Sequence, residues 1–274
     1  MSDVSTPRRI SAPSPRLLWL EQRVVLEFAS LGLAAPWLAG VDRGDGHPVL
    51  VLPGFGAGDG ETRFLRRQLR RWGYWAHGWQ QGRNLGPTPN VQAGLVQRLA
   101  SLYRHHNRKV SLVGWSLGGI YGRELARAFP GQVRSVITLA SPYRLRLDDR
   151  SSISPLVERL TGDRPPAARD GWPPEDDRAP LTVPATSIYS RTDGIVRWHA
   201  CIDREGPRRE NVEVLSSHVG LAVNPSVLYV IGDRLAQPEG TWSPFRPPPR
   251  LRRLYPAPAA WDDAGGGSRG QGAK

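Results

Sequence analysis

Short apolar runs alternate with longer amphipathic segments between residues 47 and 236, and this alternation limits the possible folds more than any other feature. The runs have the length and the Gly, Pro or Asn boundaries of buried strands. Strands are predicted at residues 47–52, 74–79, 110–115, 133–140, 186–190 and 211–215. Helices are predicted at residues 61–72, 90–105, 117–129 and 225–236. The order predicts the α/β class, with a doubly wound, mostly parallel sheet and helices on both faces.

The other residues flank or interrupt this alternation. We expect residues 1–16 to form a disordered arm, residues 17–40 an amphipathic helix, residues 45–238 the main domain and residues 239–274 a Pro- and Gly-rich tail. The alternation breaks at residues 144–180, which are rich in Arg, Asp and Pro. Because this segment follows a strand, at the edge where such sheets carry their functional loops, it is predicted to be a lid or cap insertion.

The strongly apolar segment 17–38 also contains Glu21, Arg23 and Glu27. These charges, and the lack of an Ala-x-Ala cleavage site, argue against a signal peptide and against a membrane-spanning helix. Apolar residues recur at helical spacing and predict one stripe, formed by Leu17, Leu20, Val24, Phe28 and Leu31. The stripe is expected to pack on the domain, with peripheral membrane contact through residues 17–38 as the alternative.

Charge and composition exclude several classes of function. The net charge is +12, from 37 Lys+Arg and 25 Asp+Glu, but the basic residues are dispersed, so no nucleic-acid partner is predicted. The single cysteine, Cys201, cannot form an intramolecular disulfide and is expected to fill apolar space. No metal site and no cofactor are predicted, and a cytoplasmic location, possibly at a membrane, is expected. The oligomeric state stays open.

Gly114-Trp115-Ser116-Leu117-Gly118 is the motif with the clearest chemical meaning. A G-x-S-x-G pattern alone is weak, but here it follows a predicted strand and precedes a predicted helix. A serine in such a tight strand-to-helix turn is held out of the sheet, with the amino end of the helix beside it. The glycines are needed because a Cβ would collide with the neighbouring strand or helix. Ser116 is therefore the predicted nucleophile.

A nucleophilic serine needs a base, and the base needs an acid that orients it. In this kind of fold they follow the serine in the order acid, then histidine. Four of the six histidines precede Ser116, which leaves His199 and His218. His218 is the predicted base, because it lies in the loop after the last strand, whereas His199 is expected in a helical segment.

Asp193 is the predicted acid, because it ends a strand and is followed by Gly194, which suits a turn. Asp203 and Glu205 are weaker candidates. The acidic cluster Glu175–Asp177 precedes the strand and is expected to be solvated.

Acyl transfer also needs hydrogen-bond donors for the oxyanion. The backbone N–H of Leu117, directly after the serine, is one predicted donor. The second is expected in the loop after the first strand, at Phe55, with Gly54 or Gly56 as alternatives. Arg83 and Asn84 are expected to brace their loop rather than hold a polar group of a substrate.

Together these motifs resemble the α/β-hydrolase superfamily, and its bacterial lipase and esterase branch in particular. The resemblance rests on residues 52–56, 114–119 and 193–194 and on His218, and it covers about residues 45–238. It implies a serine esterase or lipase with a Ser116–His218–Asp193 triad and no cofactor, acting on a small-molecule or lipid ester. Many relatives carry His-Gly where this chain has Pro53-Gly54.

Three tryptophans on or near loops of the active edge, Trp79, Trp115 and Trp198, are candidate substrate-binding residues, with core packing as the alternative. Two further functions stay open. One is an acyltransferase that uses the same triad, and the other is a catalytically silent binding protein with the same fold.

Overall fold

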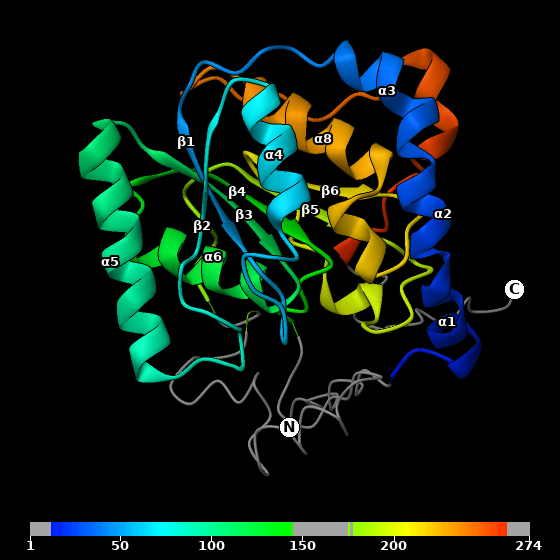
Figure 1. Cartoon of the computed structure of the whole chain (residues 1–274), viewed down its shortest axis with the longest axis horizontal. Coiled ribbons are helices and arrows are strands. Elements are labelled where there is room, and N and C mark those ends of the chain that lie inside the picture. Colours follow the sequence, from blue (N-terminus) through cyan, green and yellow to red (C-terminus); the bar gives the residue numbers. More distant parts are fainter. Residues whose placement is uncertain (1–11, 145–174, 176–177, 262–274) are drawn as a thin grey trace, which may run out of the picture.

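Six parallel strands form one sheet in the order β2-β1-β3-β4-β5-β6 in the computed structural model, which describes residues 12–144, 175 and 178–261 (Figure 1). The strands are β1 (Pro48–Leu52), β2 (Trp75–Gly78), β3 (Val110–Trp115), β4 (Val133–Leu139), β5 (Ala185–Tyr189) and β6 (Arg209–Glu213). Every predicted strand is present, and the predicted fold class is confirmed.

Helices bury both faces of this sheet. One face packs against α4 (Arg63–Arg71) and α8 (Pro225–Ala236), and the other against α5 (Pro89–His106) and α6 (Leu117–Ala128) (Figure 1). Side chains of β1 alternate between the two cores, with Val49 and Val51 in one and Leu50 and Leu52 in the other. Burial on both faces explains why the strands appear in the sequence as continuous apolar runs.

The position of β6 differs from the prediction by two residues. The sequence predicts residues 211–215, because Leu215 continues the apolar pattern. Backbone pairing with β5 instead begins at Arg209 and ends at Glu213, and Leu215 is exposed. An edge strand is defined by its hydrogen bonds to one neighbour, so its ends can carry polar side chains that an apolar pattern misses.

The N-terminal segment, residues 15–39, forms a series of short helices rather than one. These are α1 (Pro15–Trp19), η1 (Leu20–Arg23), α2 (Val24–Ala29) and α3 (Leu31–Ala39). Of these, α3 packs against α8, whereas η1 and α2 pack against η4 (Val219–Ala222), the short turn that follows His218. The predicted apolar stripe does not form a buried face, because none of its five residues is buried. In these four helices the buried residues are instead Ala34 and Leu38, both in α3. Among the described residues, no helix combines the length and apolarity needed to cross a membrane.

Several predictions fall on residues 1–11, 145–174, 176–177 and 262–274, which lie outside the described residues. They include most of the predicted arm, nearly all of the predicted lid and the end of the tail. Glu175 is described, and its predicted solvation is wrong. Its carboxylate is buried and pairs with Arg123 and Arg127 of α6.

Arg123 forms the centre of a buried ion cluster that ties α6 to two other parts of the chain. Its Nη1 donates to Asp203 Oδ2 at 2.8 Å, its Nη2 donates to Glu175, and its guanidinium lies 4.0 Å from the centre of the Tyr143 ring. Since α6 begins directly after Ser116, this cluster helps to fix the helix that follows the predicted nucleophile. It also explains Asp203, a weaker acid candidate, as a structural carboxylate.

Replacing Arg123 with leucine should lower the free energy of unfolding by about 3–5 kcal/mol, because buried Asp203 would lose its closest cation and buried Glu175 would keep only that of Arg127. Urea denaturation of the purified variant measures this loss. Arg71→Leu is the matched control, since Arg71 is an exposed arginine at the end of α4, and its effect should stay within about 0.5 kcal/mol. Equal stabilities of the two variants would contradict a structural role for the cluster.

Candidate functional site

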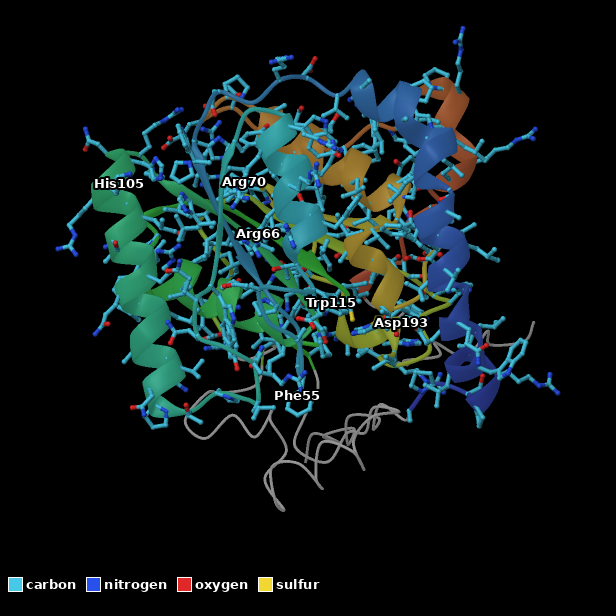
Figure 2. The ribbon with its side chains drawn as sticks, viewed as in Figure 1. Phe55, Arg66, Arg70, His105, Trp115 and Asp193 are labelled. Carbon is cyan, nitrogen blue, oxygen red and sulfur yellow. The ribbon has the colours of Figure 1, made fainter. Side chains whose placement is uncertain are left out.

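The loops that follow the parallel strands meet at one edge of the sheet. Phe55 follows β1, Ser116 follows β3, Asp193 follows β5 and His218 follows β6. Figure 2 shows Phe55, Trp115 and Asp193 at this end of the molecule and Arg70 and His105 toward the opposite end. Parallel strands place their carboxyl ends side by side, so residues far apart in the sequence reach the same edge.

Ser116 occupies a strained turn between β3 and α6. Its φ is 53° and its ψ is −121°, a backbone conformation that non-glycine residues rarely adopt. A Cβ on Gly114 would lie 2.4 Å from Gly119 N, and a Cβ on Gly118 would lie 2.3 Å from Leu52 O. The motif glycines therefore allow α6 to start against β3 and β1, as the sequence predicts, and this close packing holds Ser116 in its turn.

His218 and Asp193 form a buried pair. His218 Nδ1 lies 2.6 Å from Asp193 Oδ2, and because a carboxylate can only accept, Nδ1 donates and Nε2 is left as the acceptor. Asp193 Oδ1 accepts from the backbone N–H groups of Ile195 and Val196, both at 2.8 Å. Burial lowers the pKa of His218, but the charge and hydrogen bond of Asp193, together with the charge of Glu21, raise it above the ordinary 6.5.

Trp115 connects the turn of Ser116 to the histidine. Its Nε1 donates to the carbonyl oxygen of His218 at 3.1 Å, and the two rings lie 6.0 Å apart. The residue next to Ser116 in the sequence therefore contacts His218 directly. Ser116 Oγ itself has no hydrogen-bond partner among the residues that the structure describes.

The loop after β1 lies against Ser116. A Cβ on Gly54 would be 3.2 Å from Ser116 Cβ. The N–H of Gly56 is already bound to Asn84 O at 2.7 Å, whereas in the described part of the chain the N–H of Phe55 has no hydrogen-bond partner. Leu117 starts α6, where backbone N–H groups lack acceptors within the helix. Phe55, directly after Gly54, and Leu117, directly after Ser116, thus each keep an N–H group that is not bound to another described residue.

Asn84 braces this loop. Its side chain donates to Pro53 O at 2.8 Å and accepts from the hydroxyl of Tyr121 at 3.1 Å. It is fully buried, which agrees with the predicted bracing role.

The three candidate substrate-binding tryptophans occupy different environments. Trp79 is 0 % exposed and its Nε1 donates to Gly82 O, so it offers no surface to a substrate and belongs to the core. Trp115 is partly exposed beside His218. Trp198 lies in η3 (Trp198–Ala200), stacks on His199 and lines a hollow of about 160 Å³ together with Asp193.

A second Asp–His–Ser chain lies at the amino ends of the strands. His47 Nδ1 lies 2.5 Å from Asp45 Oδ1, and His47 Nε2 lies 2.8 Å from Ser111 Oγ. Ser111 and His47 are both 0 % exposed, and Ser111 sits inside β3, with no helix amino end beside it. Burial, followed by the charge of Arg134, lowers the pKa of His47 to about 4. This chain is therefore a buried structural network, and it supplies matched controls for Ser116 and Asp193.

No group of three or more His, Cys, Asp or Glu side chains in the described part of the chain could hold a metal ion. Cys201 is buried, and burial raises the pKa of its thiol well above the ordinary 9.0. Its predicted role as an apolar filler is therefore confirmed.

Sequence reasoning missed a set of charged side chains that reach this edge from the N-terminal segment. Glu21, Arg23 and Glu27 contact the loops that carry Asp193 and His218. The available signal was their position inside an otherwise apolar segment.

Residues 49–267 match the model of the Alpha/beta hydrolase family. Among solved structures, a lipase B of Aspergillus fumigatus is similar with a TM-score of 0.53 and 17 % identity, over 70 % of this chain and 53 % of that one. The Bacillus licheniformis lipase BlEst2 is similar with a TM-score of 0.51 and 18 % identity, over 70 % and 93 % of the two chains. This chain thus spans about half of the fungal lipase, and these identities support the fold alone. No curated protein sequence matches the chain significantly.

Proposed function

This chain belongs to the alpha/beta hydrolase family, and from that premise we propose that it is a serine hydrolase that cleaves carboxylic esters through Ser116, His218 and Asp193. One observation carries the proposal. The buried His218–Asp193 pair contacts Trp115, directly before a serine held at φ 53° at the amino end of α6. His199, the other histidine that follows Asp193, lies in η3 and stacks on Trp198.

The proposed reaction begins when Ser116 Oγ attacks the ester carbonyl. His218 Nε2 takes the hydroxyl proton and then gives it to the leaving alcohol, which leaves an acyl group on Ser116. Asp193 keeps the proton of the neutral imidazole on Nδ1 and stabilises the imidazolium. Water then attacks the acyl-enzyme with His218 again as base, releasing the acid and restoring the serine.

The proposed oxyanion donors are the N–H groups of Phe55 and Leu117. Both belong to backbone that packs against Ser116 or follows it directly. Preorganised N–H donors of this kind stabilise the negative charge that develops on the carbonyl oxygen. Trp115 and Trp198 are proposed to supply apolar contacts for the acyl chain or the alcohol.

Covalent labelling and an ester panel test the proposal on the unchanged protein. A fluorophosphonate probe should modify Ser116, identified by peptide mapping, and nitrophenyl esters of graded acyl length should be hydrolysed. Added alcohols reveal the acyltransferase alternative, because the acyl group would then appear mainly as a new ester. A protein with neither labelling nor hydrolysis would instead be a binding protein with this fold.

We also propose that the substrate reaches this site from a lipid surface that binds the outer side of the N-terminal segment. Seven large apolar side chains of this segment are exposed, namely Leu18, Trp19, Leu20, Val25, Leu26, Phe28 and Leu33. Of its four charged residues, Arg16 is exposed, whereas Glu21, Arg23 and Glu27 face the domain, so from residue 24 to residue 40 the outer side carries no charge. The net charge of +12 favours an anionic surface.

Vesicle flotation tests this contact. The protein should float with anionic phospholipid vesicles, and the triple variant Trp19→Ser, Leu26→Ser, Leu33→Ser should bind at least about a hundredfold more weakly, because each side chain contributes roughly 1.5 kcal/mol when buried. The control is Leu85→Ser with Leu215→Ser, two exposed leucines outside the segment, which should bind like the parent. Equal binding of the triple variant and the parent would contradict the contact.

A further inference from the structure

Glu21 of the N-terminal segment binds the backbone of both loops that carry the proposed acid and base. Its Oε1 accepts from the N–H of Gly194 at 2.8 Å and from the N–H of His218 at 3.0 Å. Its Oε2 accepts from the N–H of Val219 at 3.1 Å. One carboxylate thus joins the residue after Asp193 to His218 itself, and hydrogen bonds to a charged acceptor are stronger than neutral ones.

Arg23 and Glu27 repeat this pattern on the neighbouring residues of the same two loops. Arg23 Nη2 donates to Thr192 O at 2.7 Å and to Ser216 O at 2.6 Å. Glu27 Oε1 accepts from the N–H of Ser217 at 2.7 Å. Arg23 and Glu27 also bond to each other at 3.2 Å, so they hold the two loops as a connected unit.

Two glycines give the N-terminal segment its close approach. A Cβ on Gly194 would lie 2.2 Å from the backbone oxygen of Leu17, and a Cβ on Gly220 would lie 1.6 Å from a carboxylate oxygen of Glu27. Neither glycine has a positive φ. Space for the N-terminal segment, rather than turn geometry, is therefore what requires glycine after Asp193 and after His218.

We propose that Glu21, supported by Arg23 and Glu27, positions the Asp193 loop against the His218 loop and thereby sets the geometry of the histidine. This inference rests on the proposed function, because it assigns positioning residues to that reaction. The three residues touch no reacting atom, and their hydrogen bonds act through the two loops.

The position of Glu21 has an electrostatic consequence as well. Among the described residues, the carboxylates that act on His218 are Asp193 and Glu21, and both stabilise the imidazolium. Removing the charge of Glu21 lowers the pKa of His218, both directly and by loosening the Asp193 bond. The acidic limb of kcat/KM, where His218 must lose its proton to act as base, then moves to lower pH.

Glu21→Gln tests the proposal, with Glu239→Gln as the matched control. Glu239 is an exposed carboxylate that pairs with Lys109, a residue at the amino end of β3. Glu21→Gln should lower kcat between about tenfold and a hundredfold, the usual effect of displaced catalytic groups, with little change in KM. Its acidic limb should move to lower pH, whereas Glu239→Gln should match the parent. Rates are divided by the concentration of active sites, measured by fluorophosphonate titration, so that unfolded protein does not lower the reported kcat.

Gly194→Ala is a second, independent variant, because its Cβ displaces the backbone of Leu17 without changing any charge. It should lower kcat to a similar extent. The control is Gly131→Ala, which should keep the kcat of the parent because a Cβ at this position meets nothing within 4 Å. If Glu21→Gln and Gly194→Ala both keep the kcat and pH profile of an active parent, the positioning role is wrong and the hydrolase function stands. If the parent itself shows neither labelling nor hydrolysis, the proposed function is what fails.

Discussion

Replacing Ser116 with alanine should reduce ester hydrolysis by about 10⁴–10⁶-fold and abolish labelling by a fluorophosphonate probe. The hydroxyl is the only protein group in the proposed mechanism that bonds to the acyl carbon, so no neighbouring side chain can replace it. The fold should persist, since Ser116 Oγ has no hydrogen-bond partner among the described residues. The rate with short nitrophenyl esters measures the loss, and circular dichroism checks the fold.

Ser111→Ala is the matched control for this experiment. Ser111 is the serine of the second Asp–His–Ser chain, with its Oγ 2.8 Å from His47 Nε2. A hydrogen-bond chain alone does not make a nucleophile, because attack also needs access to substrate and oxyanion donors. Ser111 is fully buried inside β3, so its variant should keep the activity of the parent. If Ser111→Ala lost activity and Ser116→Ala kept it, the nucleophile would be Ser111, at the opposite end of the sheet.

Much of the fold could be predicted because a parallel sheet buried on both faces leaves a strong pattern. The four central strands are apolar runs, and the helices on the sheet show one apolar side. The edge that carries Ser116, Asp193 and His218 follows from the same pattern, since each residue lies within three residues of the end of a predicted strand. Chain order alone therefore placed these three residues at one edge, without any knowledge of distances.

The N-terminal segment was predicted less well because its polarity is reversed. A helix on a globular domain usually turns apolar side chains inward and charges outward. Here Glu21 and Glu27 turn inward, because the loops beneath them present backbone N–H groups that lack other acceptors. A periodic pattern shows which residues share a side, but it does not show what the other surface offers.

The misassigned residues share a physical cause. Glu175 was expected to be solvated from its acidic neighbours, yet buried Arg123 supplies a cation that only the tertiary structure brings close. Trp79 was expected at the active edge from its position after β2, yet its side chain turns into the core. Position after a strand predicts the edge that a residue reaches, but not the direction of its side chain.

Replacing Asp193 with asparagine should lower kcat by about 10⁴-fold at neutral pH. The reason lies in how the carboxylate is held. Its Oδ1 accepts from the N–H groups of Ile195 and Val196, so the oxygen of the asparagine amide would stay there. The amide nitrogen would then face His218 Nδ1 and donate to it. The imidazole would carry its proton on Nε2, where it cannot accept the proton of Ser116.

Asp45→Asn is the matched control, because Asp45 bonds to His47 as Asp193 bonds to His218. It should lower stability, because Arg108 and Arg134 also bind this carboxylate, but it should keep the kcat of the parent per fluorophosphonate-titrated site. In Asp193→Asn the acidic limb of any residual activity should also move to lower pH, since the main charge that raises the pKa of His218 is gone. An Asp193→Asn variant with the parent's kcat would show that another carboxylate orients the base. Glu21 would then be the first to examine, because its charge also acts on His218.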